Sequence, residues 1–153
     1  MLIGLIADTH GLVRPEVFRA LNGVEIILHA GDVGGAHVLD ELGAIAPVMA
    51  VYGNVDPPGD PNLSRSIEWR ADEVRIHVSH GHELGSPAPD RLLVRYDADV
   101  IVYGHTHNAL VHRAGARLVV NPGAAGPKRF DVKPTVARLT IAGSRAGVQI
   151  VRL

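Results

Sequence analysis

The chain has 153 residues, of which 46% are hydrophobic and 20% are charged, and it contains no cysteine. This composition is typical of one compact domain covering residues 1–153, and it excludes disulfides and cysteine-ligated zinc or iron–sulfur sites. The formal net charge of -1 gives no reason to expect non-specific binding to nucleic acid or membranes. No apolar run approaches the roughly 20 residues that a membrane span needs, so we expect a cytoplasmic protein.

The first third of the chain alternates predicted strands with predicted helices. Helices are predicted from Pro15 to the Asn22-Gly23 pair and over residues 36–42. This alternation favours a parallel sheet, in which a binding site forms beyond the carboxyl ends of the strands. The apolar runs predicted as buried strands cover residues 2–7, 25–30 and 47–52, and they end in Asp8-Thr9-His10-Gly11, Gly31-Asp32-Val33-Gly34-Gly35 and Gly53-Asn54-Val55-Asp56.

The remainder of the chain is predicted to be mostly β-structure. Strands are expected over residues 64–69 and 73–79, followed by a helix over 89–96 and a strand that begins at Val100. Two hairpins are expected next, over residues 109–120 and 135–153, and the second of these turns through residues 143–147. The whole pattern predicts an α/β fold with a core of two sheets flanked by helices.

Pairs of polar side chains spaced two residues apart recur at the predicted strand ends. The strand from Val100 is followed by Gly104-His105-Thr106-His107, and residues 73–79 are followed by His80-Gly81-His82. In an extended segment this spacing points both rings to the same side, and imidazole is the commonest side-chain ligand for a transition metal. One such pair is equally compatible with a surface loop, but the recurrence at several strand ends favours a metal site.

Seven side chains with oxygen or nitrogen donors form the candidate metal site. They are too many for one ion and suit two ions that share a carboxylate. Carboxylate, imidazole and amide donors together favour manganese, iron or zinc and disfavour copper(I) or calcium. Two divalent ions would leave the site net positive, which suits an anionic phosphate ester, and such ion pairs stabilise in-line displacement at phosphorus. The candidates are Asp8, His10, Asp32, Asn54, His80, His105 and His107.

This ordered set of segments resembles the calcineurin-like metallophosphoesterases, and in particular their small single-domain phosphodiesterase branch. The resemblance covers nearly the whole chain. Each motif is weak alone, but five or six in the right order, each closing a predicted strand, are highly specific. The matching segments are Asp8-x-His10, Gly31-Asp32, Gly53-Asn54-x-Asp56, His80-Gly81-His82, Gly104-His105-x-His107 and Asn121-Pro122-Gly123.

The resemblance implies a four-layer αββα sandwich of two mixed β-sheets. It also implies a dinuclear site in which Asp32 bridges the two ions and a metal-bridging hydroxide attacks phosphorus in line. Under this assignment the first ion is held by Asp8, His10 and His107, and the second by Asn54, His80 and His105. We expect manganese, with iron, zinc, nickel or cobalt as alternatives.

Two positions depart from the family pattern. Many members carry a histidine between the asparagine and the aspartate of the third motif, where it assists the leaving group, but this chain has Val55. General acid catalysis is typically worth about 10²–10⁴-fold, so esters with basic leaving groups become less certain substrates. Asp56 then lacks its usual partner, and we expect it to support the metal ligands in the catalytic centre. Ala124 replaces a usual serine, with a minor effect expected.

Four further residues are candidates for the chemistry, each beside a plainer alternative. His82 could face the substrate and donate a proton as a catalytic residue, or be a solvated loop histidine. Asn121 could bind substrate, or be a turn residue before Pro122. Arg129 could contact a phosphate, because a guanidinium pairs well with oxyanions, or be a solvated charge. His29 could support the metal ligands, or be a hydrogen-bonded core histidine.

The sequence therefore predicts a metal-dependent phosphoric ester hydrolase that acts on small phosphate esters, with phosphodiesters preferred over monoesters. The alternative is a non-catalytic metal-binding scaffold of the retromer-subunit type, a relative known chiefly for protein interaction. The intact ligand set favours the enzyme, whereas Val55 favours the scaffold. Small members of the family often self-associate, so the resemblance also suggests a homo-oligomer.

Overall fold

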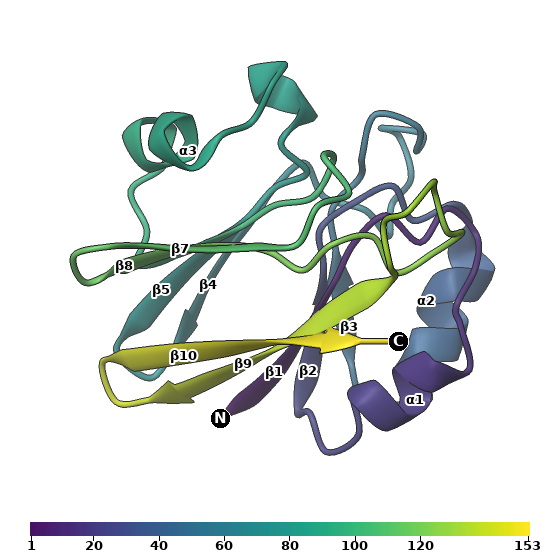
Figure 1. Ribbon diagram of the computed structural model, residues 1–153, viewed down its shortest axis with the longest axis horizontal. Coiled ribbons are helices and arrows are strands. Elements are labelled where there is room, and N and C mark those ends of the chain that lie inside the picture. Colours follow the sequence, from purple (N-terminus) through teal and green to yellow (C-terminus); the bar gives the residue numbers. More distant parts are fainter.

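The computed structural model describes residues 1–153 and contains two mixed five-stranded sheets (Figure 1). The first sheet has the order β10-β9-β1-β2-β3 and consists of β1 (Leu2–Ile6), β2 (Ile26–His29), β3 (Val48–Ala50), β9 (Thr135–Ala142) and β10 (Arg145–Arg152). The second has the order β4-β5-β6-β8-β7 and consists of β4 (Ile67–Ala71), β5 (Val74–Val78), β6 (Val100–Val102), β7 (Leu110–Ala114) and β8 (Arg117–Asn121).

Three α-helices and one 3₁₀-helix cover the outer faces of the sheets. Helices α1 (Glu16–Ala20) and α2 (Ala36–Gly43) lie against the first sheet, and α3 (Pro89–Arg95) lies against the second, with the 3₁₀-helix η1 (His82–Leu84) beside it (Figure 1). The layers are therefore helix, sheet, sheet and helix, and the predicted αββα sandwich is confirmed. None of these helices combines the length and the apolar character needed to cross a membrane.

The apolar runs of the sequence follow from burial of both faces of each sheet. In β1, Ile3 and Leu5 face a cluster of 18 buried residues between the two sheets, whereas Leu2 and Ile6 face the layer formed by α1 and α2. Alternating side chains of one strand therefore enter two different apolar layers, which explains why Leu2–Ile6 shows no polar alternation.

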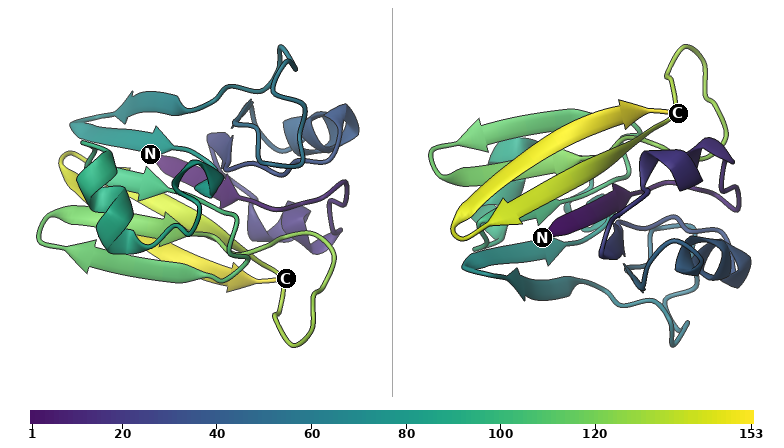
Figure 2. Two further views of the ribbon diagram at one scale, coloured as in Figure 1. Left: turned by 90° about the horizontal axis from the view of Figure 1, so that it is seen from above. Right: turned by 90° about the horizontal axis from the view of Figure 1, so that it is seen from below.

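The parallel strands direct their carboxyl ends to one edge of the molecule. Strands β1, β2 and β3 are parallel neighbours in the first sheet, and β5, β6 and β8 are parallel neighbours in the second. Figure 2 shows that the long loops gather at one end of the strands, while tight hairpin turns occupy the other. The six loops that follow these strands therefore meet, as expected for a site at the carboxyl edge of parallel sheets.

Two predicted strand boundaries were wrong. Ser64 does not begin β4, which starts at Ile67; instead it bridges to Val51, with its N–H donating to the carbonyl of Ala50, and thereby extends the edge of the first sheet. The last turn is also shorter than expected, because β9 reaches Ala142 and β10 starts at Arg145. In β10, Ala146, Val148 and Ile150 alternate toward the core, and Gly147 pairs within the strand.

Candidate metal centre

The loops at the carboxyl edge bring all seven candidate ligands together. Each loop follows a parallel strand whose register fixes where the loop begins. Asp8 and His10 follow β1, Asp32 follows β2, Asn54 follows β3, His80 follows β5, and His105 and His107 follow β6.

Four of these side chains form one compact cluster. A ligand atom from each of Asp8, His10, Asp32 and His107 lies within 4.8 Å of the others. The Nε2 atoms of His10 and His107 are 3.4 Å apart, and His107 Nε2 is 3.5 Å from Asp8 Oδ1. Two carboxylates and two imidazoles at this separation form a donor set suited to a divalent transition metal.

The remaining three candidates form a second cluster, which adjoins Asp32 through His80. The amide oxygen of Asn54 is 3.1 Å from His80 Nε2 and 3.1 Å from His105 Nδ1. Asp32 Oδ2 is 3.3 Å from His80 Nε2 and 3.7 Å from His10 Nε2. The carboxylate of Asp32 therefore stands between the two groups, as a shared ligand would.

The backbone of these loops is held in an uncommon conformation. Seven non-glycine residues of the chain have positive φ, and five of them are candidate ligands. Each such residue costs roughly 1 kcal/mol or more, and strain of this kind concentrates at functional sites. The five are Asp8 (53°), His10 (46°), Asp32 (53°), His105 (71°) and His107 (64°).

Two observations test whether a cation fits here. Asp8 Oδ1 is buried and has no hydrogen-bond partner, an arrangement that is costly unless a cation neutralises it. The carbonyl of Ala30 accepts a 2.8 Å hydrogen bond from His80 Nδ1, so in the neutral ring Nε2 is an unprotonated acceptor facing the oxygens of Asn54 and Asp32. The residues present therefore fit a metal.

The pKa values of Asp32 and His80 shift in opposite directions. Without a metal, burial opposes ionisation of Asp32, but the protonated ring of His80, which then donates through Nε2, and the Val55 N–H outweigh it and lower the pKa of Asp32 to about 2. Burial also opposes protonation of His80, yet the carboxylates of Asp32 and Asp8 raise its pKa. The raised pKa of His80 reflects the negative potential of the two carboxylates, and the lowered pKa of Asp32 keeps that carboxylate ionised, so both shifts favour binding of a cation.

A hydrogen-bonded chain behind the ligands ties the β1 loop to the β2 loop. His29 Nδ1 accepts from the Gly31 N–H at 3.1 Å, so Nε2 carries the proton and donates to Thr9 Oγ1 at 2.9 Å. Thr9 Oγ1 then donates to the Val33 carbonyl at 2.7 Å. His29 is thus a buried supporting histidine. The supporting role of Thr9 was not predicted from the sequence, although Thr9 lies between Asp8 and His10 in the first motif.

Neutral His29 should make the stability of the metal-free protein depend on pH. Burial lowers the pKa of His29 from 6.5 to about 4, so the unfolded chain binds this proton more readily than the folded one. Stability should therefore be full above pH 6.5 and fall by about 3 kcal/mol between pH 6.5 and 4. Urea unfolding across this range should show a shallower fall in His29→Asn, and an unchanged slope would contradict this assignment.

Asp56 lies behind the ligands and contacts none of them. Its carboxylate accepts hydrogen bonds from the backbone N–H groups of Val33, Gly34 and Gly53, at 2.9, 3.0 and 2.9 Å. The side chain is buried and its acceptor sites point at the β2 and β3 loops. Asp56 therefore holds the Asp32 and Asn54 loops together, and the structure gives it no contact with reacting atoms.

Asn121 is fully buried and holds the histidine loop. Its Nδ2 donates to the Gly104 carbonyl at 3.1 Å and to Thr106 Oγ1 at 3.0 Å. Its Oδ1 accepts from the Gly123 N–H at 2.9 Å, and the residue is fully buried. These bonds fix the segment from Gly104 to Thr106, which precedes His107.

Asn121→Asp should therefore destabilise the protein and weaken metal binding. The change replaces two hydrogen-bond donations with a buried carboxylate facing the Gly104 carbonyl, and should lower the free energy of unfolding by about 2 kcal/mol. Denaturant unfolding and metal titration measure the two effects. Thr106→Val removes only one of the two bonds and should cost about 1 kcal/mol. Wild-type stability in Asn121→Asp would exclude this role.

His82 and Arg129 border the candidate ligands without joining them. The ring centre of His82 is 5.3 Å from that of His80 and 6.4 Å from that of His105. Arg129 is exposed in the loop before β9, and its charge helps to lower the pKa of His10, although burial is the main cause. His82 therefore lies beside the second cluster, and the charge of Arg129 acts on His10.

Comparison with known proteins identifies the family. Residues 1–144 match the model of the calcineurin-like phosphoesterase superfamily domain. A probable metallophosphoesterase of Methanothermobacter thermautotrophicus is 36% identical over 99% of this chain and 92% of its own. The phosphodiesterase YfcE of Escherichia coli K12 is 33% identical over 81% of this chain and 79% of its own.

The solved structures agree on the fold. Wild-type Vps29 of Entamoeba histolytica complexed with Zn²⁺ superposes with a TM-score of 0.82 at 24% identity, over 100% of this chain and 98% of that chain. At this identity the likeness concerns the fold alone. The family match spans nearly the whole chain, from β1 into the last hairpin. The chain therefore belongs to the calcineurin-like phosphoesterase superfamily, and the resemblance seen in its motifs is confirmed.

Proposed function

We propose that this protein is a phosphoesterase with two divalent metal ions, and that it prefers phosphodiesters. The observation that carries the proposal is the position of Asp32, whose Oδ2 is 3.7 Å from His10 Nε2 and 3.3 Å from His80 Nε2, closer to both rings than Asp8 Oδ1 at 4.0 and 3.8 Å. One carboxylate shared by two separate donor clusters suits a pair of ions better than a single ion.

Each cluster would hold one ion. Asp8, His10 and His107 would bind the first, Asn54, His80 and His105 would bind the second, and Asp32 would bind both. When bound, two such ions supply Lewis-acid stabilisation of phosphoryl oxygens and lower the pKa of a coordinated water. The chain orients the candidate ligands, because the Ala30 carbonyl fixes the tautomer of His80 and the backbone N–H of His105 donates to Asp8 Oδ2 at 3.1 Å.

The charge balance of the site favours an anionic substrate. Two divalent ions outweigh the carboxylates of Asp8 and Asp32, provided that the histidines are neutral. Manganese is our first expectation for the metal, because mixed oxygen and imidazole donors suit it, with iron, zinc, nickel or cobalt as alternatives.

His82 is the candidate proton donor for the leaving group. Val55, which replaces the usual family histidine, is 57% exposed at the rim, while its N–H donates to Asp32 Oδ1 at 3.1 Å. Its side chain cannot transfer a proton, whereas the ring of His82 stands beside the second cluster. Arg129, whose charge acts on His10, is the candidate for contact with a non-bridging oxygen of the phosphate.

The test is hydrolysis of bis(4-nitrophenyl) phosphate by chelator-treated protein, with and without added manganese. 4-Nitrophenyl phosphate runs beside it as the matching monoester. We expect turnover only with metal and a faster reaction with the diester. Faster monoester hydrolysis would overturn the diester preference, and turnover that persists without any metal would overturn the metal-dependent mechanism.

A non-catalytic scaffold of the retromer-subunit type is the second candidate. Its support is the likeness in fold to Vps29, which extends over the whole chain. The same assay separates the two, because a scaffold would bind manganese in the clusters around Asp32 and still hydrolyse neither ester.

A further inference from the structure

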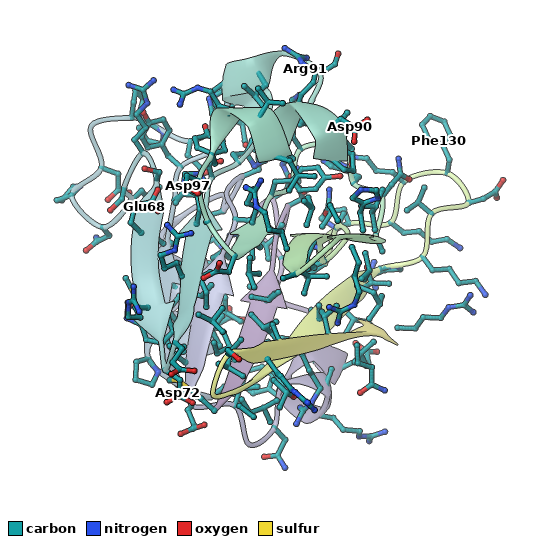
Figure 3. The ribbon with its side chains drawn as sticks, turned by 90° about the vertical axis from the view of Figure 1, so that its left-hand side faces the viewer. Glu68, Asp72, Asp90, Arg91, Asp97 and Phe130 are labelled. Carbon is teal, nitrogen blue, oxygen red and sulfur yellow. The ribbon has the colours of Figure 1, made fainter.

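A second cavity adjoins the metal centre on the outer face of the second sheet. It has a volume of about 440 Å³ and lies among β4, β5, η1, α3 and the segment from Tyr52 to Ser66. Figure 3 looks toward this side of the molecule, with Glu68 on β4 and helix α3 above the sheet. His82 lines the cavity and also stands beside His80 and His105, so one ring separates the two spaces.

The floor of this cavity is a hydrogen-bonded network on β4 and β5. His77 Nδ1 pairs with the carboxylate of Glu68, and His77 Nε2 is 3.1 Å from Ser79 Oγ. The ring of Tyr96 stacks on His77 with centres 3.7 Å apart. His77 is 1% exposed, and these contacts hold its buried ring. The Glu68 carboxylate therefore has His77 as its partner, while 67% of the Glu68 side chain is exposed.

The second carboxylate of the cavity is engaged as well. Tyr96 Oη donates to Glu83 Oε2 at 2.7 Å, and the Gly81 N–H donates to Glu83 Oε1 at 2.8 Å. Burial opposes ionisation of Glu83, but hydrogen bonds from Ser79 and Tyr96 outweigh it and lower its pKa. Glu83 therefore stays ionised, and its carboxylate accepts hydrogen bonds from Gly81, which precedes η1, and from Tyr96, which follows α3.

The two arginines of the cavity, by contrast, have no carboxylate partner. The ion pairs that arginine forms in this protein all belong to Arg75. Arg95 only lies over the ring of Tyr96, at 5.0 Å from its centre, and Arg65 forms no ion pair. The cavity is therefore lined by two guanidinium groups without an ion-pair partner, those of Arg65 and Arg95, whereas its carboxylates are hydrogen-bonded to His77 and Tyr96.

We infer that this cavity binds a second anionic group of the substrate, a phosphate or a carboxylate carried by the esterified alcohol, through Arg65 and Arg95. The inference rests on the proposed function, since the scissile phosphate would occupy the adjacent metal centre. Free guanidinium groups pair bidentately with such oxyanions, and the cavity volume is in the range of small-molecule sites. The substrate class is therefore a small phosphate ester with two anionic groups.

The test measures binding of three matched ligands to the manganese-loaded protein by calorimetry. The ligands are analogues of methyl phosphodiesters whose second alcohol is 2-phosphoethyl, 2-carboxyethyl or 2-hydroxyethyl, each with a methylene group in place of the ester oxygen to that alcohol so that this bond is not hydrolysed. We expect at least one charged ester to bind about tenfold more tightly than the hydroxyethyl ester. The stronger of the two identifies the anionic group. Arg65→Gln or Arg95→Gln should remove most of this preference and leave the affinity for the hydroxyethyl ester within about twofold.

Arg145→Gln is the matched control, because Arg145 is exposed at the start of β10 and does not line the cavity. It should keep the full preference for the charged ester. Equal affinities for all three esters, or a preference that survives both cavity variants, would overturn the inference. Hydrolysis of bis(4-nitrophenyl) phosphate by the same preparations tests the proposed function separately, because that ester carries no second anionic group.

Discussion

Asp32→Asn is expected to remove most bound metal from both clusters and to reduce hydrolysis by at least about a hundredfold. Loss of a supporting hydrogen bond behind a metal ligand already costs 10–100-fold, and Asp32 would be a direct ligand of both ions. Asparagine preserves the size of the side chain and can still accept the Val55 N–H, but it lacks the negative charge that both clusters share. Metal should therefore be lost both from the cluster that contains His10 and from the cluster that contains His80.

The measurement is metal content per chain after dialysis against manganese, with the rate of diester hydrolysis beside it. Asp40→Asn is the matched control, because Asp40 is exposed on α2 and no part of the candidate site. It should retain wild-type metal content. Wild-type metal content in Asp32→Asn would contradict the shared position of this carboxylate, whatever happened to the rate.

Gly53→Ala is expected to lower both stability and metal affinity. A Cβ at Gly53 would overlap the Oδ1 and the backbone nitrogen of Asp32, so rotation of one side chain cannot relieve the clash. Overpacking of this kind typically costs about 1–3 kcal/mol in the free energy of unfolding. Asp32 and Asn54 would move together, since Asn54 follows Gly53 directly, and metal affinity should fall by about tenfold or more.

Gly59→Ala provides an internal control in the same loop. A Cβ at Gly59 would meet no atom within 4 Å, and this glycine has no positive φ. Urea unfolding and manganese titration should both remain close to wild type in Gly59→Ala. If the two variants had equal stability and equal metal affinity, close approach of the Gly53 backbone to Asp32 would not be a requirement of this site.

The position of the ligands was predictable because strand and ligand signals coincide. Residues 2–7 are apolar on both faces, end at a polar residue and pair in parallel with the next strand, so Asp8 and Asp32 had to emerge at one edge. Spacing alone did not divide the ligands between two ions. That division depends on how the two sheets face each other, which brings His80 and His105 from the second sheet to Asn54 from the first.

Residues beside the ligands were harder to assign for a physical reason. Asp56 and Asn121 lie within three residues of a glycine after a strand, and Asp32 directly follows one, but the side chains of Asp56 and Asn121 turn inward to satisfy backbone groups of neighbouring loops. A local sequence does not specify the side toward which such a side chain turns. The second cavity was not predictable from the local sequence either, since Glu68 and Tyr96 contact His77 only in the folded chain.

We propose that this chain is a phosphodiesterase with two metal ions, both of which bind Asp32. The most direct measurement titrates metal-free protein with manganese while following bound metal and hydrolysis of bis(4-nitrophenyl) phosphate in the same samples. The account predicts two bound ions per chain and turnover that rises as the second ion binds. Two bound ions without turnover of either the diester or the matching monoester would contradict it and favour the scaffold.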